Sequence, residues 1–350
     1  MESVILNETP RRTSKSFGIN NIEIKDFEKH EIKEFTNIKV ESDIKIENTK
    51  NSFLPKFSIG KVLVDELNNA NQNLYIIIDK EIKTPIIIEF ELNEKQDVLV
   101  DNVSIFAKKN SKASIILKYK TSNENVKAYH NGVCQVFTEE GSEISVTILN
   151  LLNENSENFY SMNNKIGEDA KLKYIIADFG GNKTISNYYS NLEGKRANNE
   201  IKTMYLGTKE QILDLNYISE VYGEKGNIDI EVYGALKDNA RKNFKGTIDF
   251  KKGCKKAKGN ENEYAMLLSK TAKSKALPML LCSEEDVQGN HSNSAGKIDE
   301  AKLYYIMTRG ISRKEAQKLI VKAKFNSVLE QIENENIKKE LIEEIDRRLK

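Results

Sequence analysis

Histidine and cysteine are the residue types in this sequence with the most direct route to chemistry, and they are sparse. The three histidines, His30, His130 and His291, lie far apart, so neighbouring residues form neither an HExxH metal motif nor a Cys/His zinc ribbon. His291 lies in a dense polar segment at 283–299, between the last expected strand and the first C-terminal helix. Because a neutral imidazole can ligate iron, copper or zinc, this histidine is either a metal ligand or an ordinary residue of a surface loop.

The three cysteines are an odd number and have no metal-type spacing. This usage is typical of a reducing cytosol and argues against a disulfide framework. Cys134 lies in the apolar stretch GVCQVF, where we expect it to be buried. Cys254 lies among lysines, which indicates a solvated turn, and Cys282 ends an apolar run, which indicates burial.

The tripeptide Asp178-Phe179-Gly180 spells the magnesium-binding motif of protein kinases. The rest of that machinery is missing, because neither an HRD loop nor a glycine-rich phosphate loop occurs. The sequence also has no GxxxxGK[ST] motif for a nucleotide and no GxSxG motif for a serine nucleophile. We therefore expect a strand end followed by a turn at 178–180, and no nucleophilic active site.

Charge and hydropathy exclude several classes of protein. The 54 basic and 53 acidic side chains leave a net charge of +1, which removes the electrostatic argument for binding nucleic acid or an anionic membrane. No apolar run approaches the roughly 18 residues of a membrane span, and the N-terminus lacks the pattern of a secretory signal. We expect a cytoplasmic protein that binds neither nucleic acid nor a membrane.

Strands are expected through most of the chain. Segments rich in β-branched residues alternate with short polar turns, and no long helical pattern interrupts them, which excludes βαβ alternation. A polar or glycine turn followed by a small residue and a strand recurs at uneven intervals, which fits a β-solenoid and a large sandwich equally well. The expected strands are 74–78, 85–92, 97–107, 113–119, 144–152, 171–179, 201–206, 228–236 and 246–250.

Helices are expected at the two ends. One runs from Asp299 to Thr308, the next begins at Ser312 with Glu315 completing a capping box, and a last one covers 337–349. Near the N-terminus, the segments 26–39 and 62–69 could each form a short amphipathic helix.

The segment 284–332 resembles the C-terminal signature of the SufB/SufD family of iron–sulfur cluster assembly proteins, DDVxxxHGATxGxIDEexLFYLxSRGIxxxeArxLlxxaF. Upstream, 177–207, 233–250 and 263–282 are similar to further family motifs, so the resemblance covers roughly residues 170 to 335. The matching positions of the signature are Asp286, Val287, His291, Gly296, Ile298, Asp299, Leu303, Tyr305, Arg309, Gly310, Ile311, Glu315, Ala316, Leu319 and Phe325.

The resemblance implies a mainly β fold, with a right-handed parallel β-helix at its core. The expected division is an N-terminal mixed or helical region at 1–72, the β-helix at 73–290 and a C-terminal α-helical domain at 291–350. Between the two architectures left open by the residues alone, the resemblance selects the solenoid.

The resemblance also implies partners. Family members form SufB–SufD heterodimers or related homodimers that carry the ABC ATPase SufC, and a nascent cluster is built near the dimer interface. We therefore expect a non-catalytic scaffold subunit that pairs with a SufB-like paralogue or with a second copy of itself. The SufC-like ATPase is expected to dock on the C-terminal helices, at Leu303, Tyr305, Arg309, Gly310, Ile311, Leu319 and Phe325.

The resemblance favours a SufD-like member over a SufB-like or undifferentiated one. SufB-type chains carry a cysteine before the LLLS-like segment, whereas GNENEYAMLL (259–268) has none. SufD-type chains carry a histidine in DVKCSHGAT, onto which His291 falls, although Gly289 replaces the cysteine of that motif and SNS replaces GAT. This implies that His291 lies near a transient Fe–S cluster at the interface, with thiolates from the partner and with Glu263 and Glu284 as assisting carboxylates. No cofactor is expected to stay on the isolated chain.

Two other functions compete with the scaffold. A β-helical carbohydrate-active enzyme, such as a polysaccharide lyase, is usually exported, and both the N-terminal sequence and the match at 284–332 argue against it. A pure interaction module would make no contact with the cluster, so His291→Ala would leave cluster assembly unchanged.

Overall fold

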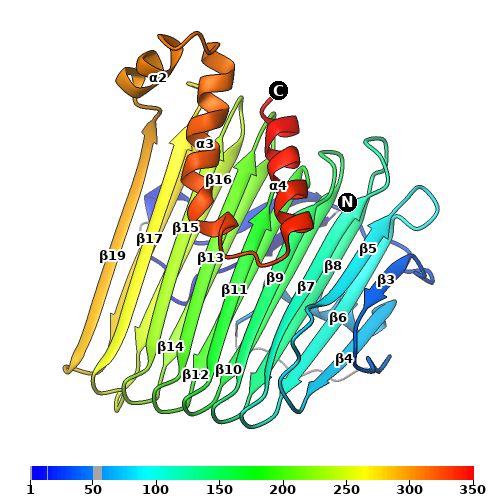
Figure 1. Cartoon of the computed structure of the whole chain (residues 1–350). Helices are drawn as coiled ribbons and strands as arrows, with labels where there is room; N and C mark the ends of the chain where they lie inside the picture. Colours follow the sequence, from blue (N-terminus) through cyan, green and yellow to red (C-terminus); the bar gives the residue numbers. More distant parts are fainter. Residues whose placement is uncertain (1, 14, 50–56) are drawn as a thin grey trace.

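Two facing sheets form the body of the protein, and the chain passes from one to the other at every corner (Figure 1). The computed structural model describes residues 2–13, 15–49 and 57–350. The eight-stranded sheet contains β4 (Gln72–Ile78), β6 (Val98–Ala107), β8 (Tyr129–Thr138), β10 (Glu157–Ile166), β12 (Lys183–Leu192), β14 (Ile212–Val221), β16 (Arg241–Phe250) and β18 (Lys273–Cys282). The nine-stranded sheet contains β3 (Ile38–Glu41), β5 (Ile86–Leu92), β7 (Lys112–Thr121), β9 (Glu143–Leu151), β11 (Lys171–Asp178), β13 (Asn198–Gly207), β15 (Asn227–Leu236), β17 (Ala257–Leu267) and β19 (Val287–Lys297).

The two sheets together are a parallel β-solenoid of about eight turns. From β4 to β19 each strand pairs in parallel with the strand two positions along the chain. Within these two sheets, as described, only the short β3 pairs antiparallel, with β5. Register partners lie between 26 residues apart (Glu157 and Lys183) and 32 residues apart (Arg241 and Lys273). The predicted solenoid is therefore confirmed, and the uneven intervals of the turn motif reflect turns of unequal length.

The corners explain the recurrent turn motif. Residues in the left-handed region, among them Asn110, Asp169 and Arg196, reverse the chain at successive corners. A small side chain follows at each of these positions and is buried, as at Ala170 and Ala197. Small residues are needed there because the corner folds back onto the interior of the solenoid.

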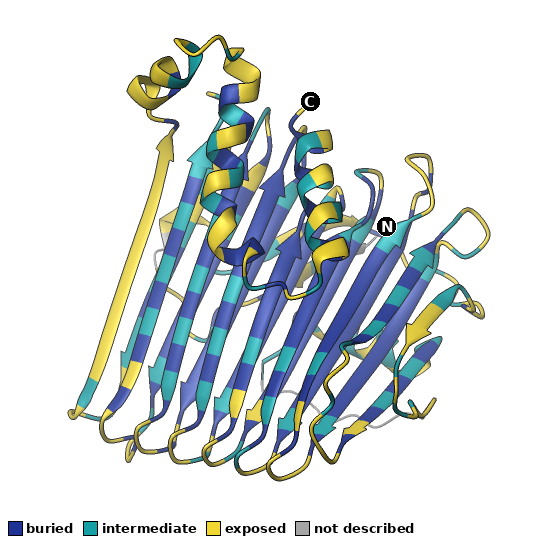
Figure 2. Cartoon of the chain, viewed as in Figure 1, coloured by how far each residue is buried: buried dark blue, intermediate teal, exposed yellow. Residues whose placement is uncertain are grey.

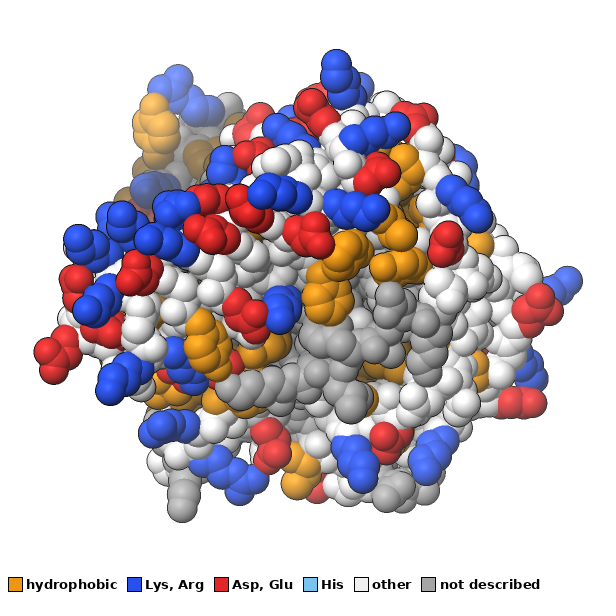
Figure 3. Space-filling model, turned by 90° about the horizontal axis from the view of Figure 1, so that it is seen from below, with side chains coloured by type: hydrophobic (Ala, Val, Ile, Leu, Met, Phe, Trp, Pro, Cys, Tyr) orange, Lys and Arg blue, Asp and Glu red, His pale blue; other side chains and the backbone are white. Residues whose placement is uncertain are grey.

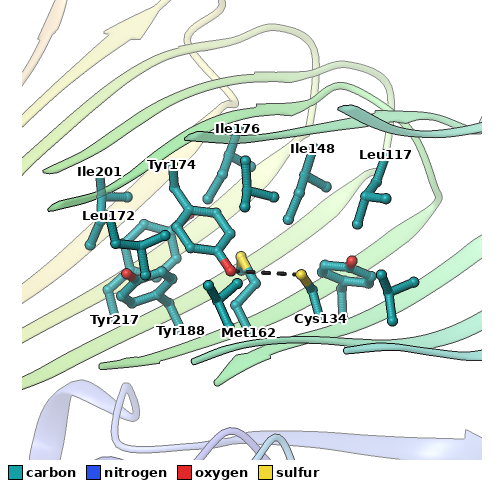
Figure 4. Close-up of a cluster of buried hydrophobic side chains, with 14 of the residues drawn as sticks. Leu117, Cys134, Ile148, Met162, Leu172, Tyr174, Ile176, Tyr188, Ile201 and Tyr217 are labelled. Carbon is teal, nitrogen blue, oxygen red and sulfur yellow. Dashed lines mark hydrogen bonds between the residues drawn. The ribbon is translucent and has the colours of Figure 1, made fainter. Parts of the chain in front are cut away.

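The interior between the sheets is filled by one continuous cluster of apolar and aromatic side chains (Figure 4). Tyr174 and Tyr188 pack edge to face with ring centroids 5.2 Å apart, which is a favourable geometry for two aromatic rings. The Tyr174 hydroxyl donates to Asn164 Oδ1 at 2.8 Å and lies 3.7 Å from Cys134 Sγ. Cys134 is thus buried, as its apolar context predicted, and burial raises the pKa of its thiol to about 12.

The N-terminal region packs on the outer face of the eight-stranded sheet. Leu6 and Leu63 contact an apolar patch on that sheet, and the Asn7 side chain donates to Asp214 Oδ1 at 2.7 Å. Residues 28–37 contain no helix, so the helix predicted at 26–39 is wrong, whereas the one predicted at 62–69 is present. The elements are β1 (Glu2–Leu6), a 3-10 turn η1 (Lys15–Phe17), β2 (Ile22–Phe27), α1 (Lys61–Glu66) and a 3-10 turn η2 (Leu67–Asn69).

Two C-terminal helices cover part of the outer face of the nine-stranded sheet (Figure 1). Val321 and Phe325 of one helix and Leu341 of the other pack against apolar side chains of that sheet. The Ser312 hydroxyl accepts a hydrogen bond from the Glu315 amide at 3.3 Å, as the predicted N-cap requires. The three helices are α2 (Glu300–Met307), α3 (Arg313–Leu329) and α4 (Glu335–Arg348), and among the described residues no helix is long and apolar enough to span a membrane.

Charged side chains of both signs are intermingled over the face seen from below in Figure 3. Ion pairs link successive corners, among them Lys109 with Glu140 at 2.8 Å and Lys195 with Glu224 at 3.4 Å. Such exposed pairs contribute little to stability, and their main effect here is to keep the local charge balanced.

The kinase-like tripeptide has a structural role. Asp178 ends β11, and Phe179 stacks on Phe325 of α3 with ring centroids 6.1 Å apart. A Cβ at Gly180 would overlap the backbone of Leu152, and Gly181 takes a positive φ of 83°. The expected strand end and turn are therefore present.

Asp178 makes stability depend on pH. Burial raises the pKa of its carboxyl from 3.8 to about 6, and Oδ2 has no hydrogen-bond partner within the described part of the chain. The folded state then holds the proton more tightly than the unfolded chain, so stability falls as pH rises from about 4 to about 6.

We expect Asp178→Asn to remove the fall in stability between about pH 4 and about pH 6. The free energy of unfolding should rise by up to about 3 kcal/mol at pH 7 and far less at pH 4. Urea unfolding followed by circular dichroism at both pH values measures it, and an equal gain at both would contradict the assignment.

Candidate functional site

The last turn of the solenoid leaves one end of the molecule uncovered. β19 pairs with β17 and forms the edge of the nine-stranded sheet. Val287 is half-buried and the other ten residues of this strand are exposed, whereas the central strands are largely buried (Figure 2). A long edge strand with free backbone groups is a template for pairing with another chain.

His291 lies on this edge strand. It was expected in a loop, and that expectation is wrong, because β19 extends from Val287 to Lys297. The boundary predicted at 290/291 accordingly falls inside a strand, and the helices begin only at Glu300. The segment has a polar sequence without a strand pattern, because β19 buries almost none of its side chains. It forms a strand by pairing with β17.

His291 shares a face with the buried row of β17. It is in register with Glu261, and Asn293 is in register with Glu263. In β17 the alternate residues 257, 259, 261, 263 and 265 are buried, so these side chains point into the solenoid. Because in-register neighbours of a parallel sheet point to the same face, His291 and Asn293 also face the interior, but at its open end.

Glu261 is a buried carboxylate without a partner. Neither of its oxygens has a hydrogen bond within the described residues, and its side chain is fully buried. Burial, followed by the neighbouring Glu263, raises the pKa of Glu261 to about 8. Gly246 of β16 makes room for it, because a Cβ there would overlap the carboxyl group. Sequence reasoning missed Glu261, although the alternation Glu-Asn-Glu at 261–263 places both acids on one face of a strand.

Glu263 was expected to assist at the cluster, but its carboxylate is already engaged inside the solenoid. It forms a buried ion pair with Lys242, and it accepts a hydrogen bond from the Tyr205 hydroxyl at 3.1 Å. The Lys242 ammonium also donates to the Lys275 carbonyl at 3.1 Å. Breaking such a buried pair is costly, so Glu263 has a structural role in this conformation.

Glu284 lies in the corner before β19, where it organises the backbone. Its carboxylate accepts hydrogen bonds from the amides of Gly253 at 2.9 Å and Glu285 at 3.1 Å, and these bonds lower its pKa. A groove of about 660 Å³ opens beside it, lined by Phe250, Leu280, Cys282, Ser283, Glu284, Glu285, Val287 and Gly289.

The cysteines at this end differ from their sequence expectations. Cys282 is exposed in the groove and donates to the Glu284 carbonyl at 2.8 Å, so its predicted burial is wrong. Cys254 is buried, so its predicted solvation is also wrong, and burial raises the pKa of its thiol to about 11. Within the described residues no three histidine, cysteine or carboxylate side chains gather to hold a metal ion.

The residues expected to bind the ATPase divide into two groups. Leu303 and Phe325 are fully buried and pack within the chain, so they offer no surface in this conformation. Tyr305, Arg309 and Leu319 are exposed and Ile311 is half-buried, while Gly310 takes a φ of 85° at the end of α2. The Arg309 guanidinium donates to the Tyr305 hydroxyl at 3.0 Å. Tyr304, 70% exposed, adds to this surface and was not anticipated.

Comparison with known proteins gives a consistent result. The family model described as "SUF system FeS cluster assembly, SufBD core domain" matches residues 90–324. The chain is 26% identical over 287 residues to the iron–sulfur cluster assembly protein SufD of Bacillus subtilis, and 24% identical over 287 residues to a SufBD family protein of Pyrococcus horikoshii. These matches cover 81% of this chain, and they span 65% and 64% of the two relatives.

A further relative gives a shorter match. The iron–sulfur cluster assembly protein SufD of Escherichia coli is 28% identical over 114 residues, which is 33% of this chain and 27% of that protein. The family model alone covers more than half of the chain, from within β5 to within α3. The chain belongs to the SufBD family of the SUF iron–sulfur cluster assembly system.

Proposed function

We propose that this chain is a SufD-like, non-catalytic scaffold subunit, which pairs through its open end with a SufB-like subunit and carries a SufC-like ATPase on its C-terminal helices. The exposed edge strand β19 carries this proposal, because it leaves eleven residues of ladder uncovered beside an open interior. A second copy of the chain is the alternative occupant, since a two-fold axis could pair two identical ends.

A nascent Fe–S cluster would be held at this interface as cargo. His291, on the inward face of β19, would be the ligand from this chain. Thiolates would come from the partner, because burial raises the pKa values of Cys134 and Cys254 and the exposed Cys282 is bonded to the Glu284 carbonyl. The isolated chain would then keep no stable cluster. A cytoplasmic location remains a prediction from the usage of cysteine.

The first test of the proposal is to purify the tagged full chain from its own cells. Mass spectrometry then identifies the proteins that copurify with it. Recovery of an ABC-type ATPase together with a cysteine-bearing paralogue is the expected result. Recovery of the chain only as a homodimer without an ATPase would overturn the heterodimer, and we would then test cluster assembly on the homodimer.

We expect Asn293→Arg to abolish pairing with the paralogue while leaving the ATPase bound. The substitution places a charge on the inward face of β19, where a partner would cover it, and an unpaired buried charge costs several kcal/mol. Asn290→Arg is the matched control on the opposite face of the same strand. Size-exclusion chromatography of the reconstituted subunits measures pairing, and unchanged pairing of Asn293→Arg would place the interface elsewhere.

The double substitution Tyr305→Ala with Leu319→Ala should weaken binding of the ATPase and leave pairing with the paralogue unchanged. Both side chains are exposed, at 61% and 43%, so their removal disturbs the fold little but deletes apolar contact area. We expect at least about tenfold weaker ATPase binding by calorimetry and normal pairing with the paralogue. Tyr222→Ala, an exposed tyrosine far from α2, serves as the control, and equal affinities in all three proteins would exclude this surface.

His291→Ala in the reconstituted complex separates the scaffold from a pure interaction module. The scaffold predicts slower or incomplete cluster formation with both partners still bound, followed by the visible absorption of the cluster. An unchanged rate and yield would show that His291 does not contact the cluster.

A further inference from the structure

A pocket between the N-terminal region and the outer face of the eight-stranded sheet is strongly basic. Its volume is about 480 Å³, within the range of roughly 300–1,000 Å³ that is typical of small-molecule sites. β2 forms one side of the pocket, and the first residues of β12, β14, β16 and β18 form the other. Two acids, Glu23 and Asp26, line it together with six basic residues, which are Lys25, Lys183, Arg241, Lys242, Lys273 and Lys275.

Three of the six basic side chains are already engaged within the chain. Lys183 pairs with Glu157 at 2.6 Å, and the Lys275 ammonium donates to the Phe17 carbonyl at 2.7 Å. Lys242 points into the interior of the solenoid, where it forms the buried ion pair described above. The positive charge that remains for a ligand therefore comes from the other three.

Two of these three, Arg241 and Lys273, lie side by side. They are register partners in β16 and β18, and adjacent strands of a sheet lie about 4.8 Å apart. Both side chains are exposed on the outer face, because Lys242, the residue after Arg241, points inward. Like charges directly opposite each other in a sheet are destabilising, and neither side chain has a hydrogen-bond or ion-pair partner within the described residues.

The acids of β2 do not balance this charge. Glu23 accepts a hydrogen bond from the Ser3 hydroxyl at 2.7 Å. Asp26 is a single exposed carboxylate, whereas Lys25, Arg241 and Lys273 are three cations. The pocket thus keeps an excess of positive charge beside two adjacent cations, and an anion placed between them would remove their repulsion.

We propose that this pocket binds a phosphate-bearing small molecule, with its phosphate between Arg241 and Lys273. The guanidinium offers paired donors that match two phosphate oxygens, and the ammonium adds a compact positive charge. Ile22, Ile24 and Ile212 give the pocket an apolar side, against which a nucleobase or another apolar part of the ligand would pack. The site does not depend on the proposed function, because the C-terminal helices pack on the other sheet.

Calorimetric titration of the full chain with inorganic pyrophosphate, at an ionic strength of about 0.15 M, tests the pocket. We expect one pyrophosphate per chain and at least about tenfold weaker binding in Arg241→Gln and in Lys273→Gln. Lys258→Gln is the matched control, since Lys258 is an exposed lysine at the start of β17 whose register partners, Asn227 and Gln288, are uncharged. All three side chains are exposed, so the variants should fold, as circular dichroism would show.

A second titration, with ADP, distinguishes the two sources of phosphate. Tighter binding of ADP than of pyrophosphate would support the pocket as a nucleotide site that uses its isoleucines, and equal or weaker binding would support it as a site for the phosphate group alone. Failure of both probes to bind to the wild-type chain would overturn the proposal. Affinities unchanged in Arg241→Gln and Lys273→Gln, or reduced equally in Lys258→Gln, would also overturn it, since binding would then not depend on this pair of cations.

Discussion

Every feature of this protein depends on the parallel ladder that joins each strand to the strand two positions later in the chain. The ladder keeps residues in register over turns of 26 to 32 residues, so that equivalent side chains stack in rows along the solenoid. A row can be apolar, as in the interior, or it can bring together residues such as Glu261 and His291 that lie far apart in sequence. The same regularity creates a difficulty, because a stack of turns always has two ends.

The two ends and the two outer faces of the solenoid differ in how far other elements cover them. At the first end the short antiparallel β3 closes the nine-stranded sheet, and Phe35 and Ile38 pack against the interior cluster. The N-terminal region covers one outer face, and α3 and α4 cover part of the other. The far end has no such cover in the described structure, since β19 is exposed along ten of its eleven residues. This uncovered edge is the reason why the pairing surface is proposed at this end.

The sequence predicted elements whose signals are local and missed those that depend on tertiary contacts. The helices α2 to α4 were predicted because capping residues and helical spacing lie within each segment, and most strands of the nine-stranded sheet carry runs of β-branched residues. The patterns missed β8, β10, β12 and β14, each of which contains buried asparagine. The Asn216 side chain, for example, donates to the Glu8 carbonyl at 3.0 Å, a partner that only the folded chain supplies. The patterns also missed the last three strands, β17, β18 and β19.

In the candidate site, too, the features that depend on tertiary contacts could not be predicted from the sequence. The family signature located His291, but neither the strand that carries it nor its neighbour Glu261 could be inferred, because both follow from the register of β17 with β19. Glu263 and Leu303 have residue types suited to a metal site and a docking surface, yet burial engages them in the fold itself. Burial and register are properties of the assembled solenoid, and no local pattern encodes them.

One strand connects the open end with the helices. β17 presents Glu261 and Glu263 to the interior, and on its opposite face Tyr264 receives the Lys324 ammonium of α3 at 4.0 Å from the ring centroid. The same ammonium lies 5.1 Å from the ring of Tyr233 in β15, so α3 is fixed to two adjacent strands by cation–π contacts. A shift of α3 would have to break these contacts or move β17 with it. Because β17 is also the only strand that pairs with β19 in the described structure, one strand contacts both α3 and the edge strand at the open end.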